Sequence, residues 1–205
     1  MALVKYNNNS ISAITTAGQL ASGGMVLIKE QTASSSASIS FVDGSGGVVL
    51  DSTYPIYLFK FINIHPATND KAFGFQANAS GGSGYNETIT STYFQTWHDE
   101  ADSSTSVTYS AGRDQANGTS FQILDAGLGT DNDQSQVGIL HLFNPSSTTF
   151  VKHFVFTGQL AHYGDYSQNE YVAGYFNTTS AIDEVQFKMS SGNIDAGDIC
   201  LYGIA

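Results

Sequence analysis

Alternation between hydrophobic and polar residues is the feature that most constrains this fold, and it is clearest between Ile182 and Ile204. Every second residue from Val185 to Met189 is hydrophobic, a period typical of a strand with one buried and one solvent-exposed face. Gly192 and Gly197 then supply the positive φ that tight turns require. A second alternating run occupies residues 199–203. The stretch therefore predicts two strands that close a β-sandwich. Its expected core residues are Val185, Phe187, Met189, Ile199 and Leu201.

Similar short runs, separated by turn signals, recur along the chain. The longest, Tyr54–Ile64, is apolar on both faces except at Lys60, which predicts a central strand between two layers. Asp43-Gly44 is the strongest hairpin signal, and a second hairpin is expected between residues 138–143 and 149–157. A short helix near residues 97–103 is the one helical expectation. About ten strands in this pattern predict an all-β fold, an antiparallel, jelly-roll-like β-sandwich.

The first 24 residues differ from the rest of the chain. Their hydrophobic residues are too irregular for a helix face, so residues 1–24 are interpreted as an N-terminal arm leading into a single β-sandwich domain, residues 25–205. This arm could pack on a neighbouring subunit. It lacks the apolar segment and cleavage site of a secretory signal, and no run approaches the roughly 20 apolar residues of a membrane span.

Charge is sparse and strongly acidic. Only 12% of the residues are charged, and 18 acidic against 7 basic residues give a net charge of −11. The basic residues are scattered singly and form no basic stripe, which disfavours nucleic acids and anionic membranes as partners. Cys200 is the single cysteine, so a disulfide within the chain is impossible, and we interpret it as a small buried hydrophobic residue.

Motifs for catalysis or metal binding are weak. The chain lacks a P-loop, a GxSxG elbow and an HExxH pair. Asp99, Glu100 and Asp102 form the densest acidic cluster, which is interpreted as a solvated loop, with glycosidase chemistry as the alternative. Residues 131–133 resemble the start of an EF-hand loop, but Gln136 replaces its glycine, and no glutamate closes it. We therefore expect no catalytic residue, no cofactor and no metal.

Histidines and aromatic residues leave two alternatives open. No two histidines have the local spacing of a metal site, although His141 and His153 lie in strands expected to pair. The pairs Trp97–His98 and Tyr163–Tyr166 are candidate stacking platforms for a sugar. The alternative interpretation is that these aromatic residues cover the ends of the sandwich or an oligomer interface. The five histidines are His65, His98, His141, His153 and His162.

Several stretches resemble a family of virion structural proteins of marine tailed bacteriophages, of the capsid decoration or tail-fibre type. They are MALVKYNNNSISAIT, TASSSASISFVDGSGGVVLDSTYPIYLFKFINIHPAT and GDYSQNEYVAGYFNTTSAIDEVQFKMSSGNIDAGDICLYGI, which together cover more than half of the chain. The resemblance implies a jelly-roll-like structural protein that folds in the host bacterial cytoplasm and joins the virion during assembly. It carries over no functional residues.

These observations lead to one expected function and two alternatives. We expect a non-enzymatic capsid decoration protein on the head of a tailed bacteriophage, a homo-oligomer, with a trimer favoured, that contacts the major capsid protein or other virion proteins. The first alternative is a tail-fibre or receptor-binding module that recognises host-surface glycan. The second is a depolymerase-type glycosidase that uses the acidic residues at 99–102.

Overall fold

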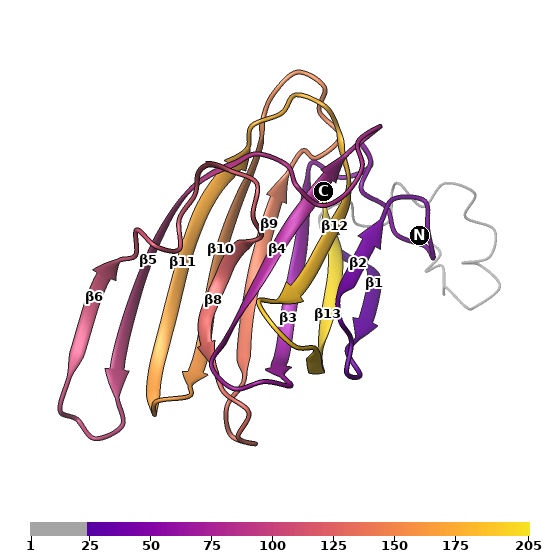
Figure 1. The fold of residues 1–205 in the computed structure, drawn as a ribbon. Coiled ribbons are helices and arrows are strands. Elements are labelled where there is room, and N and C mark those ends of the chain that lie inside the picture. The colour runs from indigo at the N-terminus through magenta and orange to yellow at the C-terminus, as the bar shows by residue number, and fades with distance from the viewer. Residues whose placement is uncertain (1–23) are drawn as a thin grey trace, which may run out of the picture.

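The structure, a computed structural model, describes residues 24–205 and consists of antiparallel strands in this range (Figure 1). It confirms the all-β prediction, but its 13 strands exceed the expected number of about ten. The predicted helix at 97–103 is wrong, since a strand continues to Asp99. The strands are β1 Met25–Thr32, β2 Ile39–Val42, β3 Ile56–Pro66, β4 Lys71–Ala79, β5 Ile89–Asp99, β6 Thr105–Tyr109, β7 Ala116–Gly118, β8 Gln122–Leu128, β9 Gln136–Phe143, β10 Lys152–His162, β11 Tyr166–Phe176, β12 Ile182–Met189 and β13 Ile194–Ile204.

The strands form two layers that are joined along one side. The larger sheet has the order β6-β5-β11-β10-β9-β3-β13-β1, and the smaller has the order β8-β4-β12-β2. A single pairing between His162 of β10 and Leu128 of β8 connects them. Because this pairing makes the strand hydrogen bonding continuous from one sheet to the other, the sandwich curls toward a barrel. The short β7 pairs with the start of β5.

The two C-terminal strands lie in different layers. β12 lies between β4 and β2 in the smaller sheet, whereas β13 lies between β3 and β1 in the larger one. The predicted core residues are confirmed, because all five are buried. Although consecutive in the chain, the two strands do not pair with each other. Alternation fixes which face of a strand is buried, but it does not fix which strand lies beside it.

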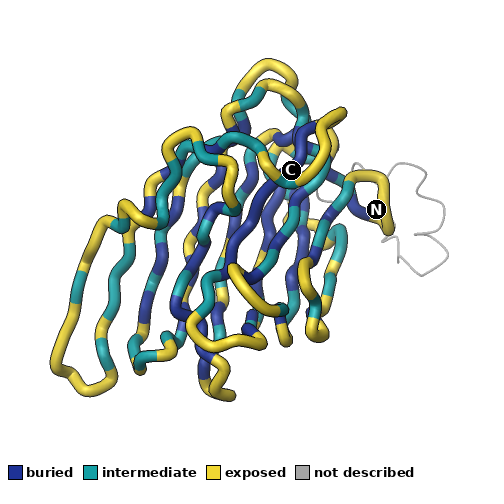
Figure 2. Tube along the Cα trace, in the orientation of Figure 1, coloured by how far each residue is buried: buried dark blue, intermediate teal, exposed yellow. Residues whose placement is uncertain are grey.

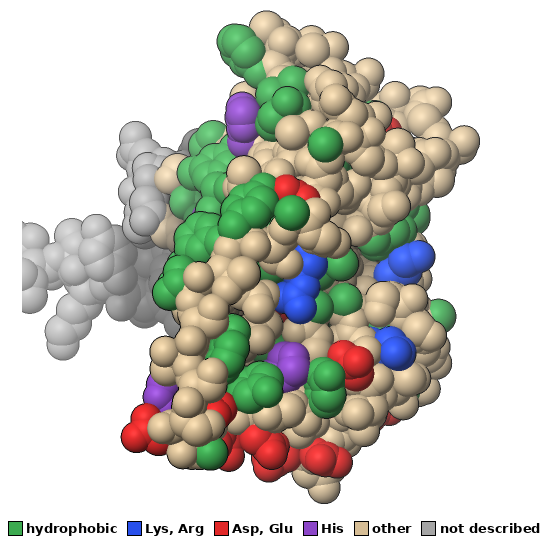
Figure 3. Space-filling model, turned by 60° about the vertical axis from the view of Figure 1, so that its left-hand side comes forward, with side chains coloured by type: hydrophobic (Ala, Val, Ile, Leu, Met, Phe, Trp, Pro, Cys, Tyr) green, Lys and Arg blue, Asp and Glu red, His purple; other side chains and the backbone are tan. Residues whose placement is uncertain are grey.

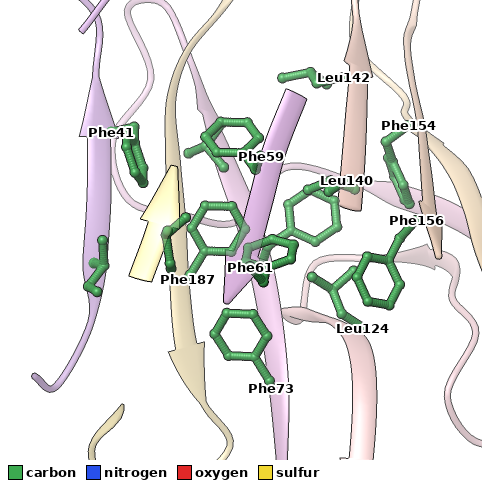
Figure 4. Close-up of a cluster of buried hydrophobic side chains, with 14 of the residues drawn as sticks. Phe41, Phe59, Phe61, Phe73, Leu124, Leu140, Leu142, Phe154, Phe156 and Phe187 are labelled. Atoms are coloured by element: carbon green, nitrogen blue, oxygen red, sulfur yellow. The ribbon is translucent and has the colours of Figure 1, made fainter. Parts of the chain in front are cut away.

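A cluster of phenylalanines fills the space between the layers (Figure 4). Phe187 of β12 lies at its centre, with its ring centroid 5.1 Å from Phe59 and 5.2 Å from Phe61, both on β3. It also stacks on Phe73 of β4 at 5.9 Å. These edge-on and stacked contacts each add to the free energy gained from burial of the rings. Figure 2 shows the resulting buried band across the strands.

Several local predictions can now be judged. The β9–β10 hairpin is confirmed. β3 lies inside its sheet, between β13 and β9, but it is not enclosed between two layers, because Lys60 on its outward face is exposed. Cys200 is buried. Residues 48–50 form no strand, although Val48 and Leu50 are buried. The expected arm lies outside the described residues apart from Gly24. Between residues 24 and 205 there is no helix with the length and apolar character needed to cross a membrane.

Candidate functional site

One end of the larger sheet carries a row of aromatic side chains, here called the aromatic shelf. Its members come from β5, β11, β10 and the turn after β10: Trp97, Tyr166, His162 and Tyr163. The ring centroids of Trp97 and Tyr166 are 5.0 Å apart, those of Tyr166 and His162 are 5.1 Å apart, and those of His162 and Tyr163 are 4.5 Å apart. The rings are therefore in continuous contact from β5 to the turn.

Strand alternation places most of the shelf on the face that lines the core elsewhere. Trp97 is four residues from buried Tyr93, and His162 is two residues from buried Leu160. Residues two or four apart on a strand share a face. Here, however, Trp97 and His162 are only partly buried, and Tyr163 is exposed. The face of β5 and β10 that packs against the smaller sheet elsewhere is thus open to solvent at this end.

Gly127, near the end of β8, and Gly129, just after this strand, make room for the shelf. A Cβ atom on Gly127, whose φ is +95°, would overlap the His162 ring, and one on Gly129 would lie 2.9 Å from the Tyr163 Cβ. The Tyr163 amide also donates a hydrogen bond to the Gly127 carbonyl at 2.9 Å. The close approach of this backbone to β10 therefore sets the position of two of the four shelf residues.

His162 is held in one orientation and one tautomer. Its Nδ1 accepts a hydrogen bond from the Gly164 amide at 3.0 Å, which leaves the ring proton on Nε2. Burial lowers the pKa of this imidazole below its ordinary value of 6.5, with Asp70 opposing that shift and Arg113 adding to it. The uncharged form of the His162 imidazole is therefore favoured near neutral pH.

Acidic residues border the shelf. Asp99 is the last residue of β5, and the turn after it contains Glu100 and Asp102. The turn before β11 contains Asp165, whose carbonyl accepts a hydrogen bond from the Glu100 amide at 3.0 Å. His98, on the opposite face of β5 from Trp97, lies 3.2 Å from Asp102 Oδ1. Figure 3 shows acidic side chains along the lower end of the molecule, with a histidine and hydrophobic side chains close above them.

Within this acidic turn, the Asp99 carboxylate holds the backbone in place. Its Oδ1 accepts hydrogen bonds from the amides of Ser103, at 2.8 Å, and Ser104, at 3.0 Å, and its Oδ2 accepts one from the Ser103 hydroxyl. These bonds lower the pKa of Asp99. A glycosidase acid must retain a proton near neutral pH, so this geometry gives no support to the glycosidase alternative at Asp99.

A second polar group, missed by the sequence analysis, lies inside the sandwich next to the shelf. Here called the buried polar cluster, it joins β5, β8 and β11 to the segment between β6 and β7. Glu170 and Arg113 approach to 3.5 Å, and Gln168 donates a hydrogen bond to Glu170 at 2.5 Å. Arg113 also donates a hydrogen bond to Gln95, and its guanidinium lies over the Tyr93 ring, 5.5 Å from the ring centroid. The members are Tyr93, Gln95, Arg113, Asp125, Gln168 and Glu170.

The two carboxyl groups of this cluster are fully buried. Burial raises the pKa of Asp125 well above 3.8, and the neighbouring charge of Glu170 adds to the effect. Burial likewise raises the pKa of Glu170. Neither oxygen of Asp125 has a hydrogen-bond partner among residues 24–205. Both carboxyl groups are shielded from solvent, and Glu170 contacts Arg113, which ties the β6–β7 segment to β11.

One signal for this cluster was present in the sequence. Glu170 falls on the same alternation as Val172 and Phe176, so the pattern alone placed a carboxylate among core residues. Asp125 gave a weaker signal, because the burial of β8 does not alternate regularly. Arg113 lies outside the strands, and its contact with Glu170 arises only when β11 pairs with β5.

The remaining candidate residues stay apart from both groups. His141 lies opposite Val155, and His153 lies opposite Tyr175, so the two histidines are not paired with each other. Asp131 lies in a turn closed by a 2.9 Å hydrogen bond from the Gln134 amide to its carbonyl. Across residues 24–205, no three His, Cys, Asp or Glu side chains are grouped so that they could hold a metal ion.

Comparisons with protein-family models, with curated proteins and with solved structures each gave no match.

Proposed function

We propose that this chain is a non-enzymatic virion structural protein, a capsid decoration protein on the head of a tailed bacteriophage. The resemblance of several stretches to virion proteins of marine tailed bacteriophages supports the proposal. The observation that carries its non-enzymatic part is the burial of Asp125 and Glu170. Asp125 and Glu170, whose raised pKa values suit acid–base chemistry, lie in the core, and the partly exposed Asp99 carboxylate is hydrogen-bonded within its own turn.

The position on the particle is tested by imaging particles that carry the chain. We expect a density map of the intact virion to show the two-layered domain on the head surface, in contact with the major capsid protein. Deletion of residues 1–20 should abolish attachment, while the thermal unfolding transition of the purified domain is retained. Density on the tail, or full attachment of the deleted chain, would contradict the proposal.

A second candidate function is that of a tail-fibre or receptor-binding module that recognises host-surface glycan, and the aromatic shelf favours it. Aromatic rings pack well against the apolar face of a sugar ring, and the shelf offers rings in continuous contact. The bordering carboxylates would repel sialic or uronic acids and attract ammonium groups. Neutral sugars and amino sugars are therefore the class that this surface fits.

This candidate is tested by glycan-array binding followed by calorimetry on any sugar that binds. Trp97→Ala or Tyr163→Ala should weaken binding at least tenfold. The control is Phe150→Ala, which removes an exposed aromatic side chain outside the shelf. A flat array, preferential binding of acidic sugars, or an equal loss in the control would exclude the shelf as a glycan site.

A further inference from the structure

The outward face of the larger sheet exposes large hydrophobic side chains from strands β5, β6, β9, β10 and β11. We call this surface the outer apolar face. The relative exposure of its most accessible members ranges from 38% for Ile139 to 78% for Val107. Soluble monomers rarely expose many such side chains side by side. The face comprises Phe94, Val107, Tyr109, Val137, Ile139, Val155 and Tyr171.

Strand register makes this face continuous. Tyr109 pairs with Phe94, and Phe94 pairs with Tyr171, whose ring stacks on it at 4.7 Å. Tyr171 then pairs with Thr157, which pairs with Ile139. One line of neighbouring residues therefore crosses all five strands. Val107 and Val155 lie two residues along the strands from this line, on the same side.

Charge is distributed unevenly around this face. The outward positions of the five strands carry no aspartate or glutamate, although the whole chain has 18 acidic residues and a net charge of −11. Asp114, which accepts a hydrogen bond from the Tyr109 hydroxyl, lies at one margin. Lys60, opposite Ile139, lies at the other. Contact through other surfaces would bring carboxylates of two copies together, whereas contact through this face avoids that repulsion.

The face is also hollowed. One groove of about 570 Å³ runs between Val137, Ile139, Val155 and Thr157, and a second of about 160 Å³ lies between Phe94 and Tyr171. Val155 and Thr157 line both grooves. Packed sheets require such hollows, because side chains of one sheet must insert between those of the other.

We propose that the outer apolar face binds the same face of a second copy of this chain, forming a two-fold symmetric dimer by sheet-on-sheet packing. A self-complementary patch is covered when two copies pair, so association through this face stops at two copies. This predicts dimers, or assemblies built from dimers, in place of the trimer expected from the sequence. The proposal goes beyond the virion role and does not depend on it.

The test is the mass of the full chain in solution, measured by sedimentation equilibrium over a range of concentrations. We expect a dimer whose association constant rises from 0.02 to 0.5 M NaCl, because salt screens the repulsion between two acidic copies. Val155→Asp with Ile139→Asp should weaken association more than 100-fold. Phe150→Asp, an equally drastic change at a residue that is 69% exposed outside the face, should leave it unchanged.

Folding is monitored separately by thermal unfolding of each variant. Because two new charges could unfold the sheet, Val155→Thr with Ile139→Thr provides a milder pair that keeps β-branched side chains. It is expected to weaken the dimer about tenfold with little change in melting temperature, because both positions are exposed. A monomeric wild type at 100 µM or above would overturn the proposal. So would a dimer that persists in the folded aspartate or threonine variants, or one that weakens as salt increases.

Discussion

Arg113 reaches from the segment between β6 and β7 into the sandwich and lies 3.5 Å from Glu170 Oε1, a carboxylate that is fully buried. This relationship joins an irregular segment to the central part of the larger sheet. It also gives a buried negative charge a partner, without which the cost of burial would be large.

Arg113→Met should lower the free energy of unfolding by roughly 2–4 kcal/mol, because it leaves the Glu170 charge buried without its cation. Urea unfolding monitored by circular dichroism measures this. Adding Glu170→Gln to the same chain should recover part of the loss, since the double variant buries no unpaired charge. A loss in the double variant equal to the sum of the losses in Arg113→Met and Glu170→Gln alone would show that the two side chains act independently.

Asp125→Asn should stabilise the protein, by on the order of 1 kcal/mol or more above neutral pH. Burial raises the folded-state pKa of Asp125, so the wild type is favoured relative to the variant below the ordinary value of 3.8. That advantage is lost as the pH rises from 3.8 through the raised pKa. Thermal unfolding of both proteins from pH 4 to pH 9 measures the difference. A stability difference between the two proteins that does not grow with pH would contradict a raised pKa for Asp125.

Phe187→Ala should cost about 3–5 kcal/mol, because it removes a ring at the centre of the phenylalanine cluster and leaves a cavity. Phe187→Asp should unfold the domain, since it would bury an unpaired charge. Phe150→Ala is the matched control, at an exposed phenylalanine, and should change stability by less than about 0.5 kcal/mol. A soluble, folded Phe187→Asp protein would show that β12 is placed with the wrong face inward.

Gly127→Ala should disturb the aromatic shelf, because the new methyl group occupies the position of the His162 ring and the backbone has a positive φ. Gly47→Ala separates the two effects, since Gly47 has φ +85° but open space around its Cβ position. We expect a loss of about 1 kcal/mol for Gly47→Ala and at least twice that for Gly127→Ala. Shifted imidazole resonances of His162 should accompany only the Gly127 change.

Local pattern predicted much of this fold, and long-range pairing accounts for what it missed. The alternation at Val185–Met189 correctly identified buried side chains, whereas the neighbours of β12 depend on strands far away in the sequence. Trp97 and His98 were grouped because they are adjacent, yet adjacent strand residues point to opposite faces. Trp97 contacts Tyr166 instead, because β5 pairs with β11, a relationship that no local pattern contains.

The placement of β12 and β13 in opposite layers has a consequence for biosynthesis. β13 is the strand that pairs with β1, and it also pairs with β3, so the first described strand has no place in the larger sheet until residues 194–204 have left the ribosome. β12 likewise separates β2 from β4 in the smaller sheet. Neither layer can close while the nascent chain is still being extended through these strands. We therefore expect folding to follow translation of residues 182–204, and chains interrupted before that point to be substrates for chaperones and proteases.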